Sequence, residues 1–310
     1  MAVNLKGRSF VSNIDFSLEE TYQVFDLSRS LKEKLLSGEP HRLLEGKTLG
    51  MIFTKPSTRT RVSFETGIYQ LGGLGMYFGP NDLQLGRSES IPDSARVLSR
   101  FLNGIMIRTF AHQEVIDLAK YSSIPVINGL TDLLHPCQIL ADLFTVLEKK
   151  RKLQGLKLAF IGDGNNVAHS LLHGCSLVGM NISVASPSGY KPDKQIVNES
   201  IKNAKYMGSK VEVVDDPVRA VKNADIIYTD VWASMGQEKE AEERKKKFIK
   251  YQVSSKLVKN AKDDYLFMHC LPAHRGDEVT NEVADSPNSV IFDEAENRLH
   301  VQKAVMALLM

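Results

Sequence analysis

The chain has 310 residues, more than one hydrophobic core usually supports, so we expect two domains of roughly 150 residues each. Its 39 lysines and arginines nearly balance 37 aspartates and glutamates, and a net charge of +2 does not favour a nucleic-acid-binding protein, which needs a basic face. The apolar runs are too short to cross a bilayer, and no signal peptide is predicted at the N-terminus. Three widely spaced cysteines do not resemble a disulfide framework, so we expect a cytoplasmic protein.

Short β-branched runs alternate with amphipathic stretches in the first half of the chain. In chain order, the pattern predicts a strand at 48–53, helices at 57–71 and 92–102, a strand at 104–107, a helix at 113–121, a strand at 125–128 and a long helix at 136–151. Pro136 suits the first turn of that last helix, because the N–H that proline lacks has no partner within the helix there.

The same alternation continues in the second half. Strands are predicted at 157–161, 181–185, 210–214, 225–229 and 265–269, with helical segments between them. Alternation of this kind predicts an α/β fold of two domains, each a mainly parallel sheet covered by helices on both faces.

A basic stretch at 149–152 marks the expected boundary between a first domain at 1–150 and a second at 151–294. A closing helix at 295–310 is expected to pack back on the first domain. The charged segment 238–247 is interpreted as a solvated helix face. Because ligands bind beyond the carboxyl ends of the strands in open α/β sheets, the polar residues that follow each strand are the candidates for function.

A turn rich in hydroxyl and guanidinium groups follows the first predicted strand directly. Ser57, Thr58, Arg59 and Thr60 open the helix at 57–71, where free backbone N–H groups and the helix dipole attract anions. The hydroxyl groups add further donors, and an arginine offers a planar fork to phosphate oxygens. The turn lacks the glycine-rich pattern of a nucleotide P-loop, so it predicts an anion site of another kind.

A second pattern, at 162–167, has the glycines of a dinucleotide-binding turn only in part. Val167 occupies the position of the third glycine. The next strand ends at Ser186 and Pro187, without the acidic residue that would hold a ribose. Dinucleotide binding is therefore not predicted.

Residues able to polarise a carbonyl group follow other strands of the first half. His135 and Gln138, at the start of a helix, can donate towards an anion or a carbonyl oxygen, and Arg108 at the end of a strand could join them. The histidines and cysteines of the chain lack the paired spacing of a zinc site, so no metal is predicted. Cys137 and Cys175 are expected to pack in the core.

Groups suited to an amino acid follow the strand at 225–229. Asp230 ends that strand, and Ser234 and Met235 lie shortly after it. A carboxylate next to a hydroxyl group suits an α-amino acid, whose ammonium and carboxylate groups need opposite partners. Asn166, which can both donate and accept, could bind the same ligand.

Together these segments resemble the aspartate/ornithine transcarbamoylase family, and within it the ornithine carbamoyltransferases. The motifs occur in order over the whole chain: STRTR at 57–61, DLQLG at 82–86, HPCQ at 135–138, GDGNN at 162–166, Asp230 with SMG at 234–236, HCLP at 269–272 and EAENR at 294–298. The first motif is shared across the family. The acceptor motifs are more specific, since an aspartate enzyme would be expected to carry His-Pro-Leu-Pro at 269–272 and to lack the SMG motif.

The resemblance implies an enzyme that transfers the carbamoyl group of carbamoyl phosphate to the δ-amine of L-ornithine, giving L-citrulline and phosphate. This reaction would serve arginine biosynthesis or run in the catabolic direction. The resemblance also implies a homotrimer, or a multiple of trimers, whose active sites are shared between neighbouring subunits. It implies no cofactor, metal, nucleic acid or membrane partner.

The resemblance also assigns roles to individual positions. The implied carbamoyl-phosphate-binding residues are Ser57, Thr58, Arg59, Thr60, Gln84, Arg108, His135, Gln138, Cys270, Leu271 and Arg298, with Gln84 supplied by the adjacent subunit. The implied ornithine-binding residues are Asn166, Asp230, Ser234 and Met235. The implied catalytic residues are Arg108, His135, Asp230 and Cys270.

Elementary chemistry agrees with these roles. An amine attacks the carbamoyl carbon, negative charge builds on the carbonyl oxygen, and phosphate departs. Each preorganised donor to that oxygen is worth roughly 10²–10³ in rate. A lysine-like amine has a pKa of about 10.4, so Asp230 and Cys270 are expected to select or help generate its neutral form.

Two alternatives are open at this point. The acceptor could be another amine, which a panel of acceptors would reveal. The chain could also be a binding or regulatory protein that kept the fold and lost catalysis. Against the second alternative, every position with an assigned chemical role holds a competent residue.

Overall fold

The computed structural model describes residues 3–84, 88–233 and 240–310. It forms two compact units, the first comprising Met1–Ala141 with Glu296–Met310 and the second comprising Asp142–Ala295. The division falls inside α5 (Pro136–Lys150) and α12 (Ile291–Leu309), and not at the basic stretch 149–152. Within the described ranges, no helix is both long enough and apolar enough to span a membrane.

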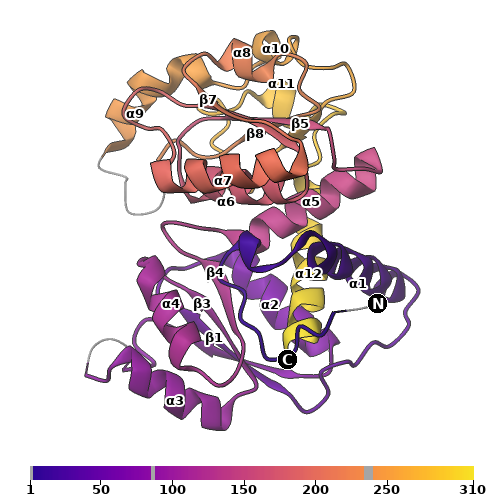
Figure 1. Ribbon diagram of the computed structural model, residues 1–310, viewed down its shortest axis with the longest axis vertical. Helices are drawn as coiled ribbons and strands as arrows, with labels where there is room; N and C mark the ends of the chain where they lie inside the picture. The colour runs from indigo at the N-terminus through magenta and orange to yellow at the C-terminus, as the bar shows by residue number, and fades with distance from the viewer. Residues whose placement is uncertain (1–2, 85–87, 234–239) are drawn as a thin grey trace. The chain divides into compact units, whose positions relative to one another are not determined.

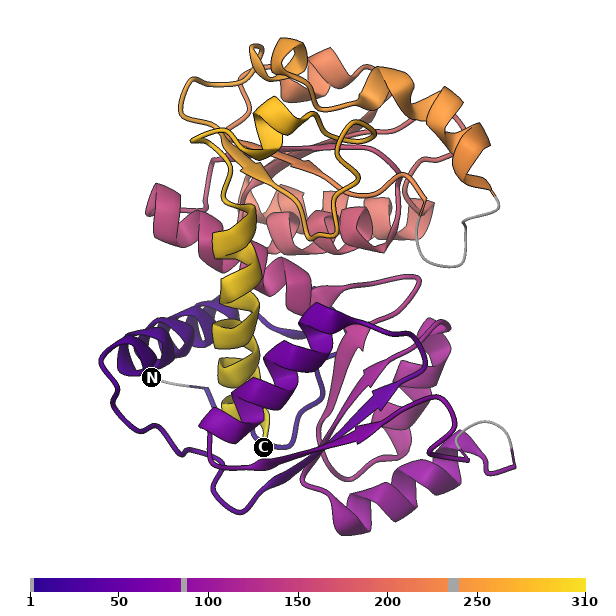
Figure 2. The ribbon, with the colours of Figure 1, turned by 180° about the vertical axis from the view of Figure 1, so that it is seen from behind.

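The first unit is built on a parallel sheet with the strand order β2-β1-β3-β4 (Figure 1). Its strands are β1 (Thr48–Phe53), β2 (Leu74–Phe78), β3 (Gly104–Arg108) and β4 (Val126–Leu130). Its helices are η1 (Asn13–Asp15), α1 (Leu18–Leu36), α2 (Thr58–Gln70), α3 (Ile91–Phe101) and α4 (His112–Tyr121), together with the start of α5 and most of α12. Helices α3 and α4 pack on one face of the sheet in a single hydrophobic cluster. On the other face α2 lies alongside α12 (Figure 2), where Gly67 leaves room for the side chains of Lys303 and Met306.

The second unit contains a parallel sheet with the order β7-β6-β5-β8-β9. Its strands are β5 (Lys157–Ile161), β6 (Asn181–Ala185), β7 (Val211–Val214), β8 (Ile226–Thr229) and β9 (Leu266–Met268). Its helices are α6 (Asn166–Leu177), α7 (Lys194–Met207), α8 (Pro217–Val221), α9 (Ala241–Phe248), η3 (Ile249–Tyr251), α10 (Ser255–Val258) and α11 (Asn281–Ala284). The central strands β5 and β8 are almost wholly buried, because helices cover both faces of a parallel sheet.

The strand registers decide which residues meet at the carboxyl ends. In the first sheet Phe53 lies opposite Arg108, so the turn after β1 and the end of β3 are neighbours. In the second sheet Tyr228 lies opposite Met268. The residues two positions further along, Asp230 and Cys270, therefore leave neighbouring strands side by side.

The predicted fold class is confirmed, and three strands, β1, β5 and β6, match their predicted bounds residue for residue. The helix predicted at 57–71 begins at Thr58, because Ser57 caps it from outside. Four elements of the described residues were not predicted: the edge strand β2, which is only partly buried, and the helices η1, α1 and α11.

The interpretation of 238–247 as a solvated helix face is wrong for one residue. Residues 238 and 239 lie outside the described ranges, and most of α9 is exposed, but Arg244 is buried and paired with Asp163. Cys137 and Cys175 are buried and free, as predicted.

Candidate active site

The turn between β1 and α2 forms as predicted from the sequence. The Ser57 hydroxyl oxygen accepts a hydrogen bond from the Thr60 N–H at 3.2 Å and so caps α2. Thr60 is buried, Ser57 and Arg59 are half-buried, and Thr58 is exposed. The helix dipole, the backbone N–H groups and the hydroxyl groups thus meet at one point, which is the arrangement that attracts an anion.

Arg298 of α12 connects this turn to the start of α5. The residue is 2% exposed, and its guanidinium donates to Gln138 Oε1 at 2.6 Å and to Thr60 Oγ1 at 3.2 Å. Through Arg298, helix α12 therefore places a planar group of charged N–H donors at the turn between β1 and α2, although the two segments are far apart in the sequence.

His135 lies among three arginines. Burial and the charges of Arg298, Arg108 and Arg59 hold the pKa of the buried His135 imidazole far below its ordinary value. His135 is therefore neutral at physiological pH, and a neutral imidazole can donate an N–H to a carbonyl oxygen without adding a charge. Three guanidinium groups around one neutral ring make an environment that favours a multiply charged anion.

Lys55 also belongs to this end of the sheet, although sequence reasoning did not select it. Its ammonium group pairs with Asp132 and lies 4.1 Å from the centroid of the Phe110 ring. Lys55 follows β1, Phe110 follows β3 and Asp132 follows β4. The buried lysine therefore connects the loops after these three strands, and its own loop leads into Ser57. In the sequence, only its position two residues before the STRTR motif could have indicated that Lys55 belongs to the site.

Gln84 has a different environment from the other predicted anion ligands. Its side chain is exposed and accepts a hydrogen bond from Ser88 Oγ at 2.8 Å. Residues 85 and 86, which complete its motif, lie outside the described residues.

In the second unit three predicted strand ends converge on Asp230. The Cys270 thiol donates to Asp230 Oδ1 at 3.1 Å, and Asn165 Nδ2 donates to Asp230 Oδ2 at 2.7 Å. Asp230 is buried, whereas Cys270 retains some exposure. Asn165 also caps α6, because its side-chain oxygen accepts from the N–H groups of Val167 and Ala168. Asn165 was not singled out in the sequence, where its neighbour Asn166 is the predicted ornithine ligand.

The protonation state of Cys270 follows from its surroundings. Burial, and after it the carboxylates of Asp230 and Glu294, raise the pKa of the thiol well above its ordinary value. The thiol therefore stays protonated near neutral pH and acts as a donor. Asp230 is the acceptor of this pair.

The turn that carries Cys270 is held by a buried histidine and glutamate. His269 Nδ1 accepts from the Leu271 N–H at 2.8 Å, so its proton resides on Nε2, which lies 3.1 Å from Glu278 Oε1. Leu271 has a φ of 57°, a conformation that bulky residues rarely adopt without such support. Glu278 was not predicted, since an isolated acid in a loop gives no sequence signal.

A second buried carboxyl group, Glu294, supports the same strand end. It accepts from the Tyr228 hydroxyl and from the His269 N–H, each at 3.0 Å. Burial and the neighbouring Asp142, to which it is hydrogen-bonded, raise the pKa of Glu294 well above its ordinary value. The carboxyl pair therefore retains a proton where exposed acids are ionised.

Asp230, His269 and Cys270 also form the only cluster of possible metal ligands found in the described part of the chain. Their donor atoms already serve hydrogen bonds within the protein, and the thiol is protonated, so the arrangement does not favour a metal. Ser234 and Met235, predicted to bind ornithine, lie outside the described residues.

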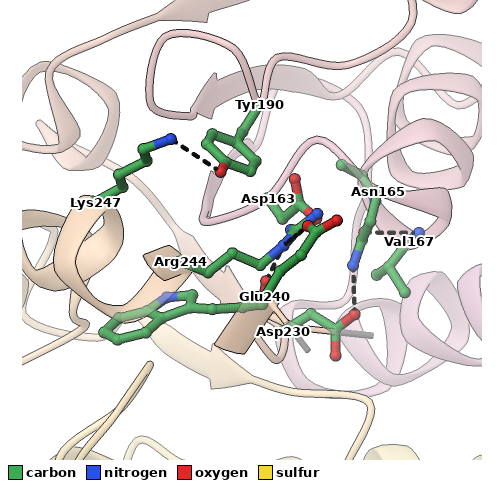
Figure 3. A network of polar contacts seen from close by, with 10 residues as sticks. Asp163, Asn165, Val167, Tyr190, Asp230, Glu240, Arg244 and Lys247 are labelled. Carbon is green, nitrogen blue, oxygen red and sulfur yellow. Dashed lines mark hydrogen bonds and ion pairs between the residues drawn. The ribbon is translucent and has the colours of Figure 1, made fainter. Parts of the chain in front are cut away.

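A network of polar contacts lies next to this cluster in the same unit (Figure 3). Arg244 Nη1 donates to Asp163 Oδ2 at 2.7 Å and to Trp232 O at 2.9 Å. The network continues through Asn165 to Asp230 in the same view. Sequence reasoning selected neither Arg244 nor Asp163, because each sits in a segment with a more obvious interpretation.

Comparison with known proteins decides the family. The carbamoyl-P binding domain of aspartate/ornithine carbamoyltransferase matches residues 8–148, and the Asp/Orn binding domain of the same family matches residues 154–309. The chain belongs to the aspartate/ornithine carbamoyltransferase family.

Named relatives and solved structures of this carbamoyltransferase family match over the full length. The chain is 60% identical over 310 residues to the ornithine carbamoyltransferase of Thermococcus kodakarensis, covering 100% of this chain and 98% of the relative. It is 58% identical over 306 residues to that of Symbiobacterium thermophilum, covering 99% of each. The solved structure of ornithine carbamoyltransferase from Pyrococcus furiosus superposes with a TM-score of 0.97 at 56% identity, covering 100% of this chain and 99% of that one.

Proposed function

We propose that this carbamoyltransferase uses L-ornithine as the acceptor, joining its δ-amine to the carbamoyl group of carbamoyl phosphate to give L-citrulline and phosphate. The observation that carries the proposal is the contact between Cys270 and Asp230, because it combines the HCLP motif of the ornithine branch with a carboxylate suited to an amine. The relatives named ornithine carbamoyltransferase support the same acceptor.

The first unit supplies the carbamoyl phosphate ligands. The N-terminus of α2, with Ser57, Thr58, Arg59 and Thr60, holds the phosphate group, and Arg298 joins it through its contact with Thr60. Arg108, His135 and Gln138 complete the set. Thr60, Arg108 and His135 donate to the carbonyl oxygen, so they stabilise the negative charge that builds there during attack. The arginines also stabilise the departing phosphate.

The second unit supplies the acceptor ligands. Asp230 accepts hydrogen bonds from a nitrogen of ornithine, with Asn166, Ser234 and Met235 as further ligands. Cys270 and Leu271 lie at the reacting amine, where the thiol donates to Asp230 and fixes the orientation of its carboxylate. The reaction needs a neutral amine, and Asp230 favours productive binding by accepting its N–H.

The direct test is a citrulline assay with carbamoyl phosphate and a panel of amines that includes ornithine, lysine, putrescine and aspartate. We expect ornithine to give by far the highest kcat/KM. A higher kcat/KM for another amine would reassign the acceptor. Complete inactivity of the assembled protein towards every amine would favour a protein that kept the fold and lost catalysis.

We further propose a homotrimer in which Gln84 acts in the site of a neighbouring subunit. Its side chain is exposed, and the one hydrogen bond that it makes within the described residues is to the exposed Ser88, which supports this role. Subunits carrying Arg59→Ala and subunits carrying Gln84→Ala should each be nearly inactive alone. Mixed trimers should recover part of the activity, because one shared site can then draw both residues from intact partners.

The control for the mixed trimers is a mixture of two preparations that both carry Arg59→Ala, which should stay inactive. Assembly of the hybrids is verified with a charge tag and native mass spectrometry. Verified hybrids without any recovered activity would contradict the shared site.

A further inference from the structure

Helix α9 carries a buried arginine within an exposed and highly charged sequence. Of its eight residues, only Arg244 and Phe248 are buried. Phe248 packs against the rings of Trp232 and Tyr190, with centroid distances of 5.9 and 4.9 Å. An apolar residue at 244 would continue this packing without the cost of removing a charge from water. The polar contacts of the buried guanidinium group must therefore explain why an arginine is present.

The contacts of Arg244 link the ends of two central strands. Its Nη1 donates to Asp163 Oδ2, just after β5, and to the carbonyl oxygen of Trp232, just after β8. Its Nε donates to Glu240 at 3.0 Å, and its guanidinium carbon lies 4.9 Å from the centroid of the Tyr190 ring. One side chain therefore fixes the distance between the loops that follow β5 and β8.

These two loops carry the polar pair of the acceptor site. Asp163 is two residues before Asn165, whose N–H donates to the Asp163 carbonyl oxygen at 2.7 Å. Trp232 is two residues after Asp230. Asn165 Nδ2 and Asp230 Oδ2 meet at 2.7 Å, so the contacts of Arg244 brace both partners of this bond (Figure 3).

Charge explains why an arginine is needed. Asp163 is buried near a second carboxylate: burial raises the pKa of Asp163, the charge of Arg244 lowers it, and the charge of Asp230 raises it again. Without the guanidinium, Asp163 would have to take up a proton or turn towards solvent. Either change would alter the turn at 163–165 that presents Asn165.

We propose that Arg244 is a positioning residue for the amino-acid substrate. Through its bonds to Asp163 and to the Trp232 carbonyl oxygen, it keeps the side chains of Asn165 and Asp230 in contact with each other. The inference rests on the proposed function, since it takes ornithine as the ligand of Asp230. Arg244 is not among the residues proposed to bind either substrate. Its effect on ornithine is transmitted by the two loops that it joins.

Arg244→Met removes the charge and keeps the length of the side chain, and Lys246→Met is the matched control on the exposed face of the same helix. We expect kcat/KM for ornithine to fall by about 10²-fold in Arg244→Met, the scale of a displacement of about 1 Å in a site. The control should keep the wild-type value. Binding of inorganic phosphate, which reports on the first unit, should be unchanged in both variants.

Two more variants separate positioning from general stability. Arg244→Lys keeps the charge but not the fork, so it should recover part of the ornithine kcat/KM. Asp163→Asn should show a defect similar to that of Arg244→Met, and the double variant should be little worse than either single one, because both act through one contact. Arg244→Lys and Asp163→Asn also serve as the test should Arg244→Met fail to fold.

Folded variants with the ornithine kcat/KM of Lys246→Met would overturn the inference, as would equal losses of ornithine and phosphate binding. Measuring ornithine binding by calorimetry shows whether the inference about Arg244 or the proposed function has failed. Wild-type protein that binds ornithine without making citrulline would refute the function alone, and the variants would then be compared by binding. Wild-type protein that binds no ornithine would refute both.

Discussion

Replacing Arg59 by alanine is expected to lower kcat/KM for carbamoyl phosphate by about 30- to 5,000-fold, which corresponds to the roughly 2–5 kcal/mol lost when one partner of a buried charge pair is removed. Arg59 lies half-buried in the first turn of α2, and its charge acts on the buried His135. Folding should be affected far less, because the hydrogen bond between Thr60 and Ser57 that caps α2 does not involve the Arg59 side chain.

Arg61→Ala is the matched control for this prediction. Arg61 is exposed on the same helix, where it pairs with Glu65 and lies over the Tyr77 ring. Exposed ion pairs of this kind contribute little to the stability of a protein, so the Arg61→Ala control should keep most of the activity. Steady-state kinetics, phosphate binding by calorimetry and thermal melting should be measured for both variants. An Arg59→Ala protein with near-normal affinity for carbamoyl phosphate would show that another group binds the anion.

The second large effect concerns the amine and Cys270. The δ-amine of ornithine resembles that of lysine, with a pKa of about 10.4, so at pH 8 only about one molecule in 250 is neutral. We expect kcat/KM for ornithine to rise with pH across the neutral and mildly alkaline range. Because the pKa of the Cys270 thiol is raised, the thiol stays protonated over this range, and the rise reflects the amine.

Variants of Cys270 test this assignment. Cys270→Ser keeps a donor to Asp230 and should lower kcat with ornithine binding less affected. Cys270→Ala should be worse, because no polar atom remains to orient the carboxylate. The rising limb of the pH profile should be present in both. Loss of that limb in Cys270→Ala would make the thiolate the proton acceptor, and an unchanged kcat in both variants would leave Cys270 with a packing role only.

The parts of the structure that were predicted well depend on local signals. The strands β1, β5 and β6 are short apolar runs bounded by helical patterns, and their observed bounds equal those predicted from the sequence. The N-cap at Ser57 is a local signal too. The placement of Arg298 was different, since only the resemblance of its motif to the family connected α12 with Thr60 and Gln138.

The errors arose where tertiary contacts override local patterns. Arg244 lies in a run of charges that indicates a solvated face, and only the folded unit shows that it faces Asp163. Asn165 was not singled out in the sequence, and only the folded unit shows that it caps α6 and contacts Asp230. Glu278 reaches His269 only because the loop after β9 folds back on itself.

The discontinuity of the first unit has a consequence for synthesis of the chain on the ribosome. Domains generally fold as they emerge, N-terminal first. Here the second unit is one uninterrupted segment, Asp142–Ala295, whereas the first unit lacks part of its packing until Glu296–Met310 has emerged. The order of completion is thus reversed, with the N-terminal unit finished last. Arg298 arrives at Thr60 and Gln138 only at that stage, so a nascent chain cannot assemble its full anion site before this last segment of the first unit has emerged.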